Sequence, residues 1–364
     1  MNRTDPKSNA PIMMLSAGNG FIMQSEKYSR DNAGQSLKKY ILLKQGELAY
    51  NHGASKAKQF GCCYELTEPE ARIPYVYHCF KINDHEYTPF IAMALNNAKM
   101  DKQLKRLVSS SVRMDGLLNI SFEDYMSVTL HLPSSTEQKH IADFLKKIDE
   151  RIAAQEKLLA SLKKYKRGLL MHYFSDDKTQ LWTQCSVSQI GKVITGSTPP
   201  TNDRSNYDGD LLFCAPGDVG EQKYISSTEK RVSPKGFALG RPLPPNSVIV
   251  TCIGLIGKLG IAKTSMITNQ QINALVVSEG FDHEFIYYAF ENFFPEYRSK
   301  VSIQTLPILS KSEFEKLMIK VPDLDVQHKI SSHLAAMDRR IEHTQQELNA
   351  LIEHRRGIMQ QLFI

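Results

Sequence analysis

A helical segment is written twice in this chain. Residues 133–174 and 322–363 align without a gap, 189 positions apart. The first copy begins PSSTEQKHIADFLKKIDERI and ends KRGLLMHYF, and the second begins PDLDVQHKISSHLAAMDRRI and ends RRGIMQQLF. An internal repeat of this period predicts two copies of a structural unit rather than one continuous domain.

Apolar residues in both copies recur at alternating spacings of four and three, which is typical of a coiled-coil seam. The predicted seam residues are Ile141, Leu145, Ile148, Ile152, Leu159 and Leu162 in the first copy, and Ile330, Leu334, Met337, Ile341, Leu348 and Leu351 in the second. Polar residues interrupt both seams at the same two places, Gln155/Thr344 and Lys166/Arg355. Such interruptions commonly fix the register of a pair.

Each helix would be about 60 Å long, and the simplest way to bury both seams is for the copies to pack on each other. Antiparallel packing fits the short joint after the first helix, whereas parallel packing needs a longer return connection. The alternative is two unrelated surface helices, each packed on its own domain.

The repeat extends upstream, where Ser121 and Tyr125 match Ser310 and Phe314. Short apolar runs at residues 75–77 (Tyr-Val-Tyr) and 248–250 (Val-Ile-Val) predict strands. We therefore expect a mixed α/β (α+β) fold with two globular domains, each followed by a long helix, and an antiparallel coiled coil of the two helices. The predicted boundaries are 1–133 and 181–321 for the domains, and 134–174 and 323–363 for the helices. Much of residues 181–210, a strand and a GSTPP loop, has no counterpart at the front of the first domain.

The composition is that of a globular protein, with 41% hydrophobic and 23% charged residues. No apolar run approaches the length of a membrane span, and no secretory signal pattern begins the sequence, so we expect a cytoplasmic protein without a membrane partner. Six cysteines without CxxC spacing indicate structural thiols rather than a zinc site or a disulfide framework. The net charge of +6 permits an acidic partner without requiring one.

Three features together resemble a known family. They are the two Pro-x4-Gln-x2-Ile…Asp-x-Arg-Ile helices, the VITGSTPP segment at 193–200 and the NQQIN segment at 269–273. Over nearly its whole length the chain resembles the specificity subunit of type I restriction-modification systems, with a shortened first domain. The resemblance implies that each globular domain is a target-recognition domain reading half of a split double-stranded DNA site. It also implies that the helices set the distance between the half-sites.

The resemblance further implies partners: two methyltransferase (modification) subunits and nuclease-translocase (restriction) subunits. It implies no catalytic residues, no cofactor and no bound metal in this chain. The residues themselves agree, because the phosphate-loop-like segment 254–259 lacks both the four-residue gap and the Ser/Thr after its lysine.

Basic and amide side chains contact phosphates and base edges. In the second domain we predict DNA contacts at loop residues that mostly lie near Gly or Pro: Thr198, Asn202, Arg204, Lys258, Asn269 and Gln270. The comparable loop of the first domain, residues 51–58, supplies Asn51, Ser55, Lys56 and Lys58. The alternative for this loop is a solvated polar turn. For the whole chain, the alternatives are a coiled-coil interaction adaptor and a decayed specificity subunit with one working DNA-reading domain.

Overall fold

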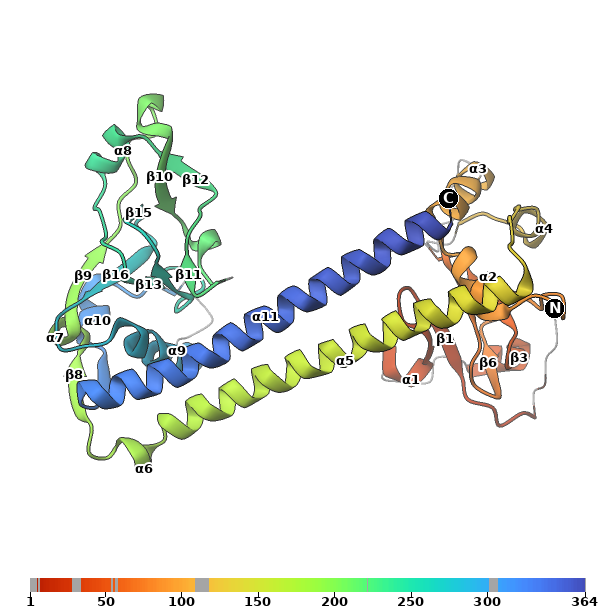
Figure 1. The fold of residues 1–364 in the computed structure, drawn as a ribbon, viewed down its shortest axis with the longest axis horizontal. Coiled ribbons are helices and arrows are strands. Elements are labelled where there is room, and N and C mark those ends of the chain that lie inside the picture. Colours follow the sequence, from red (N-terminus) through yellow and green to blue (C-terminus); the bar gives the residue numbers. More distant parts are fainter. Residues whose placement is uncertain are drawn as a thin grey trace. The chain divides into compact units, whose positions relative to one another are not determined.

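The computed structural model describes residues 5, 7–27, 34–53, 55, 58–108, 118–220, 222–300 and 307–363 (Figure 1). The chain divides into two compact units. Unit 1 comprises residues 1–156 and 346–364, and unit 2 comprises residues 157–345. The long helices α5 (Ser135–Tyr173) and α11 (Leu324–Leu362) therefore each contribute one part to unit 1 and the other to unit 2.

Unit 1 consists of short strands followed by helices. Its elements before α5 are β1 (Met13–Ser16), β2 (Gly20–Met23), α1 (Gln24–Lys27), η1 (Gly34–Lys39), β3 (Ile41–Lys44), β4 (Leu48–Asn51), β5 (Cys62–Glu65), β6 (Glu70–Ile73), β7 (His78–Phe80), α2 (Thr88–Ala94), α3 (Ala98–Leu107) and α4 (Phe122–Met126). The central sheet has the order β5-β4-β7, and β3 pairs with β6 in a second sheet.

The central sheet of unit 1 separates two hydrophobic cores. Because side chains alternate along a strand, Leu48 and Tyr50 of β4 pack with the helices α2–α5, while Ala49 packs against β1, β3 and β6. Cys63 and Cys62 of β5 divide between the two cores in the same way.

Unit 2 is richer in strands. Its elements between α5 and α11 are α6 (Asp176–Thr179), β8 (Thr183–Ser186), α7 (Val187–Ile190), β9 (Gly191–Thr195), η2 (Arg204–Asn206), β10 (Tyr207–Cys214), η3 (Pro216–Asp218), β11 (Tyr224–Ile225), β12 (Lys230–Val232), α8 (Pro234–Leu239), β13 (Val248–Thr251), β14 (Leu259–Ala262), β15 (Met266–Thr268), β16 (Ile272–Val277), α9 (His283–Lys300), α10 (Lys311–Lys316) and β17 (Met318–Val321). The sheets have the orders β11-β14-β13-β16-β9, β12-β10-β15 and β17-β8.

The two units share one plan around their central strands. In unit 2, Val248 and Val250 of β13 face the core shared with α9 and α11, while Ile249 faces the strands β10 and β15. The order β14-β13-β16 thus repeats β5-β4-β7, and unit 2 adds β9 beside β16. Among the described residues of unit 1, β7 pairs with β4 alone. The mixed α/β fold with a long helix after each domain is confirmed.

A buried glutamine near the start of each long helix makes the same contacts in both units. Gln138 Oε1 accepts from the Tyr87 N–H at 3.0 Å, and its amide donates to the Pro133 carbonyl at 3.0 Å. Gln327 repeats this with the Asp282 N–H at 2.9 Å and the Pro322 carbonyl at 2.8 Å. The two glutamines are 1% and 2% exposed. Each therefore ties the helix that follows the central sheet to the long helix of its own repeat.

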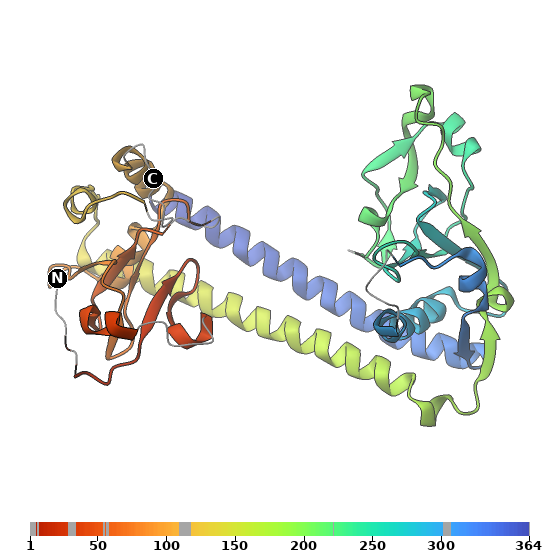
Figure 2. The ribbon, with the colours of Figure 1, turned by 180° about the vertical axis from the view of Figure 1, so that it is seen from behind.

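Within each unit the two long helices run antiparallel. In unit 1, Asp149 pairs with Arg355 and Gln155 with Glu347; in unit 2, Lys166 pairs with Asp338 and Tyr173 with His333. In each unit the residue numbers of the partners thus fall along α11 as they rise along α5, which is the antiparallel arrangement visible in Figure 1 and Figure 2. The predicted antiparallel pairing is confirmed, and every predicted seam residue is buried or half-buried.

The polar interruptions of the seam form a duplicated ion pair. Lys166 and Arg355 occupy equivalent positions in the repeat, and so do their partners Asp338 and Asp149. Lys166 Nζ lies 2.7 Å from Asp338 and 2.9 Å from Glu291, with its side chain 13% exposed. Arg355 donates to both oxygens of Asp149, one at 3.0 Å, but its side chain is 33% exposed. Burial alone would lower the pKa of Lys166, but the two carboxylates outweigh it and raise that pKa.

One predicted strand is wrong. Residues 75–77 form a turn between β6 and β7, in which the Tyr77 N–H donates to the Pro74 carbonyl at 3.1 Å. Proline at the start of this run favours the turn, and Tyr75 is 52% exposed rather than buried. The strand predicted at 248–250 is confirmed as β13. The predicted domain boundaries stay predictions. No helix in the described ranges is long and apolar enough to cross a membrane.

The unequal burial of the duplicated pair predicts unequal stabilities. Lys166→Met should lower the free energy of unfolding of unit 2 by about 3 kcal/mol, because it leaves two half-buried carboxylates without their cation. Arg355→Met should cost about 1 kcal/mol or less, because water solvates the more exposed Asp149. Urea denaturation followed by far-UV circular dichroism measures both, and Trp182 fluorescence identifies the transition of unit 2. Equal losses in the two variants would contradict this account.

Candidate nucleic-acid interface

Three loops of unit 2 leave the five-stranded sheet at the same ends of its strands, and we call this side of the sheet its loop edge. Thr251, at the end of β13, lies opposite Ile272, at the start of β16; Thr195, at the end of β9, lies opposite Asn273. The loops 196–203, 252–258 and 269–271 therefore begin or end side by side. Three of these strand ends are also bonded directly, since Thr195 Oγ1 donates to Asn273 Oδ1 at 2.7 Å and the Cys252 N–H donates to the Gln271 carbonyl.

The predicted residues Thr198 and Gln270 are in direct contact at this edge. Thr198 Oγ1 donates to Gln270 Oε1 at 2.7 Å, and both side chains are exposed. The bond leaves the Gln270 amide group as a donor facing solvent. An amide held by a neighbouring hydroxyl presents a defined pattern of donor and acceptor, which is what reading of a base edge requires.

Asn269 shapes the loop from within. It is half-buried, its Oδ1 accepts from the Gln271 N–H at 3.0 Å, and its Nδ2 donates to Gln271 Oε1 at 3.2 Å. Its own N–H donates to the Cys214 carbonyl at 3.1 Å. These bonds hold Gln270 outward, so Asn269 positions the exposed amide.

Gly196 allows the two loops to approach. A Cβ at this position would lie 2.1 Å from the Asn269 carbonyl oxygen and 2.4 Å from that of Thr268. The Ser197 N–H donates to the Thr268 carbonyl at 2.8 Å. The glycine of the GSTPP segment is therefore required by backbone contact between loops rather than by its own torsion angles.

Asn202 and Arg204 lie further along the loop between β9 and β10, and both are exposed. The loop is braced behind them, where Tyr207 Oη donates to the Pro199 carbonyl at 2.6 Å and Asn206 donates to the Pro200 carbonyl at 3.0 Å. Between them Asp203 pairs with Lys235 at 2.7 Å. The hydrogen bond from Lys235 and those from Ser205 lower the pKa of Asp203 to about 2.

Lys258 is at the same edge but is only half-exposed. Its aliphatic chain passes beside Gly220, where an added Cβ would lie 3.6 Å from Lys258 Cδ. Its backbone N–H donates to Thr251 Oγ1 at 3.0 Å.

Arg241 also lies at this edge, although it is not among the residues predicted from the sequence. Its exposed guanidinium donates to the Thr195 carbonyl at 2.9 Å, at the end of β9 and next to the loop that carries Thr198. The signal was present, because Arg241 lies between Gly240 and Pro242, the same context that singled out the other loop residues. Exposed Lys230 and Arg231 on β12 add positive charge to the strands beyond this edge.

In unit 1 the comparable loop leaves β4, the counterpart of β13. Asn51 Oδ1 accepts from the Gly53 N–H at 2.9 Å, and Ser55 Oγ accepts from the Lys58 N–H at 3.0 Å. Lys58 Nζ donates to the Asn96 carbonyl at 2.8 Å. These three predicted residues therefore brace a turn, which favours the alternative of a structural loop for them. Lys56 lies outside the described residues.

The described residues hold no group of three or more His, Cys, Asp or Glu side chains arranged for a metal ion. The six cysteines are free thiols, and burial raises the pKa of Cys62 to about 11 and that of Cys79 to about 12. Neutral, buried thiols of this kind fill hydrophobic cores.

Comparison with known proteins gives consistent matches. The profile of the Type I restriction modification DNA specificity domain matches residues 43–164 and 180–354. Among curated proteins, the specificity subunit of the type I restriction enzyme MjaIX of Methanocaldococcus jannaschii is 30% identical over 178 residues, covering 47% of this chain and 41% of that protein. The HindI specificity subunit of Haemophilus influenzae is 29% identical over 108 residues, covering 29% and 24%. The chain thus aligns with less than half the length of each of these relatives.

Solved structures share the fold over the full chain. The specificity subunit of a type I restriction-modification system from M. genitalium has a TM-score of 0.61 at 14% identity, covering 99% of this chain and 90% of its own. A chain from a study of complex assembly and conformational transition of the type I R-M system has a TM-score of 0.59 at 16% identity, covering 100% and 94%.

Close backbone approach at Gly196 predicts a specific sensitivity. Gly196→Ala should lower the free energy of unfolding of unit 2 by about 2 kcal/mol, because the loops must separate to admit a methyl group. Gly217→Ala is the matched control, since nothing lies within 4 Å of the added Cβ there, and it should leave stability nearly unchanged. Urea denaturation monitored by Trp182 fluorescence gives both values. A stable Gly196→Ala variant would show that this contact is not required.

Proposed function

The chain belongs to the family of type I restriction-modification DNA specificity proteins, and on that premise we propose that it is the DNA-recognition subunit of such a complex. In this proposal unit 2 reads one half of a split duplex site and unit 1 reads the other. The chain has no catalytic role and needs no cofactor; methylation and cleavage belong to its partners.

The observation that carries the proposal is the cluster at the sheet edge of unit 2. Thr198, Gln270 and Arg241 supply a hydroxyl, an amide and a guanidinium from three separate segments that converge on the end of β9 and the start of β16. All three are exposed. Amide and guanidinium groups are the side chains that read adenine and guanine in the major groove. Arg204, Lys230 and Arg231 would then contact phosphates beyond the reading residues.

The paired helices support a second element of the proposal, a fixed spacing between half-sites. A buried seam with a duplicated ion pair allows one register, and a stiff pair sets distance better than a flexible linker. Because the repeat duplicates the seam and its ion pair, two copies of a modification subunit could dock in equivalent ways. Restriction subunits would join the same complex in the cytoplasm.

The rival functions are a coiled-coil adaptor and a specificity subunit with one working reader. The second has support in unit 1, where Asn51 and Ser55 bond within their own loop and the Lys58 side chain bonds to the Asn96 carbonyl.

Selection from random-sequence duplexes tests the proposal. The full chain with a modification subunit should enrich a split motif, and log affinity should fall linearly with log salt concentration.

Gln270→Ala should relax one half of the motif only. Arg241→Ala should relax the same half of the motif, whereas Arg204→Ala should weaken all binding by about tenfold and reduce the salt slope by about one. Lys192→Ala, an exposed residue at the other end of β9, is the matched control. Enrichment of a single half-site would favour one working reader, and no binding at low salt would favour the adaptor.

A matched deletion in both helices tests the spacing role. Removing residues 151–157 and 347–353 takes one heptad from each helix around the Gln155–Glu347 contact and preserves the seam spacing on both sides. The loss of seven residues shortens each helix by about 10 Å, or roughly three base pairs of duplex. The selected motif should keep both half-sites and lose about three base pairs of spacer. Altered half-sites with an unchanged spacer would refute the role.

A further inference from the structure

An aromatic pair is duplicated at the junction of each domain with its helices. In unit 2, Phe174 and Phe285 lie 5.6 Å apart between ring centroids at an interplanar angle of 35°. In unit 1, Phe90 and Phe363 lie 5.4 Å apart at the same angle. Phe174 and Phe363 are equivalent residues of the repeat. The two sites can therefore be compared residue by residue.

In unit 2 an indole and a strand complete this site. The Trp182 ring lies 5.8 Å from each of the two phenylalanine rings. The residues after it form β8, and all four pair antiparallel with β17, from Thr183 opposite Val321 to Ser186 opposite Met318. Asp176, upstream in the same segment, pairs with Lys320 of β17 at 3.2 Å.

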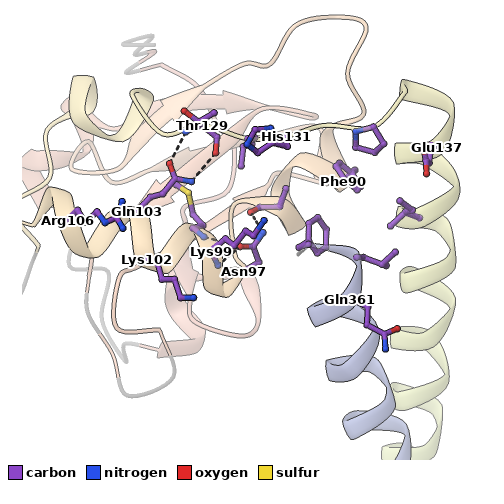
Figure 3. Close-up of a pocket in the computed structure, with 17 residues that line it drawn as sticks. Phe90, Asn97, Lys99, Lys102, Gln103, Arg106, Thr129, His131, Glu137 and Gln361 are labelled. Carbon is purple, nitrogen blue, oxygen red and sulfur yellow. Dashed lines mark hydrogen bonds between the residues drawn. The ribbon is translucent and has the colours of Figure 1, made fainter.

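In unit 1 the equivalent position is a pocket of about 630 Å³ (Figure 3). Phe90, Phe363 and Pro133 line it, and Pro133 is the counterpart of Pro322 beside the end of β17. No described residue of unit 1 packs on this phenylalanine pair as Trp182 does in unit 2. An aromatic ring suits this position, since the Trp182 indole packs on the equivalent phenylalanine pair in unit 2.

Beside the pocket, part of the backbone has no hydrogen-bond partner among the described residues. Residues 129–132 are the counterpart of β17. The Gln103 side chain bonds both the N–H and the carbonyl of Thr129, at 3.0 and 2.9 Å, as a neighbouring strand would (Figure 3). Residues 130–132 make no backbone hydrogen bond to any described residue. Backbone N–H and carbonyl groups without partners beside a groove offer a template for strand addition.

The rim of the pocket is basic. Lys99, Lys102 and Arg106 lie on one face of α3 at spacings of three and four, and line the pocket in Figure 3, with Glu137 as the one carboxylate among the lining residues. A segment with acidic residues ahead of its aromatic residue, like Asp176 and Asp177 ahead of Trp182, complements this charge.

We propose that this groove of unit 1 binds an extended segment of a second polypeptide, acidic at its start, which inserts an aromatic side chain against Phe90 and Phe363 and adds as a strand along residues 130–132. The segment would complete unit 1 as the 175–186 segment completes unit 2. The proposal does not depend on DNA recognition, because it rests on the internal comparison of the two units.

The probe is a peptide of residues 175–190, SDDKTQLWTQCSVSQI, labelled with fluorescein at its N-terminus and titrated with the full chain under reducing conditions. Saturable binding, seen as a rise in anisotropy, is expected. Trp182→Ala in the peptide should weaken binding at least tenfold by removing the indole. Cys185→Pro in the peptide should weaken it similarly, because proline interrupts a strand ladder while the indole remains.

Variants of the chain locate the site. Phe363→Ala should weaken binding of the unmodified peptide at least tenfold, whereas Ile352→Ala, an exposed position on the same helix that does not line the pocket, should not change it. Absence of saturable binding overturns the proposal, as does equal binding to Phe363→Ala. Equal binding of the Cys185→Pro peptide would overturn strand addition and leave only insertion of the aromatic ring.

Discussion

The buried glutamine at the start of each long helix is the contact on which the arrangement of both units depends. Gln138 and Gln327 accept from a domain backbone N–H and donate to the carbonyl of the proline before the helix. A buried amide with satisfied donors and acceptors allows one orientation, since any rotation leaves polar atoms without partners. The direction in which each domain leaves its helix is thereby fixed by one side chain.

Two equivalent ion pairs in the seam between the helices are buried to different extents. Lys166 and Arg355 are equivalent in the repeat and find equivalent aspartates. Only Lys166 is covered, because the long helix α9 brings Glu291 and Tyr288 over it, and Tyr288 also donates to Asp338. In unit 1 the counterpart helix α2 ends at Ala94, so Arg355 stays solvated. The two pairs are therefore equivalent in sequence and unequal in burial.

The central sheets of the two units differ in a related way, because unit 2 has strands that the described part of unit 1 lacks. Unit 2 has β9 beside β16 and β8 beside β17, and its exposed Thr198 and Gln270 lie at the edge that β9 helps to build. Among the described strands of unit 1 neither neighbour is present, and the loop at the equivalent edge bonds to itself through Asn51 and Ser55. The exposed Thr198–Gln270 contact and the added strands β8 and β9 therefore occur together in unit 2, and neither has a counterpart in the described part of unit 1.

The sequence by itself determined the repeat, the two long helices, their seam and the positions of the polar interruptions, because helical periodicity and internal identity are local properties of the chain. It also marked Thr198 and Gln270, whose contact joins residues 72 positions apart. It misplaced a strand at residues 75–77 and passed over Arg241. Only the tertiary structure decided which loop residues face solvent and that the Lys166 side chain is largely buried. It also decided that unit 1 has a pocket at the position that Trp182 occupies in unit 2. Burial and hydrogen-bond partners depend on what distant segments bring to a site, and no local pattern records that.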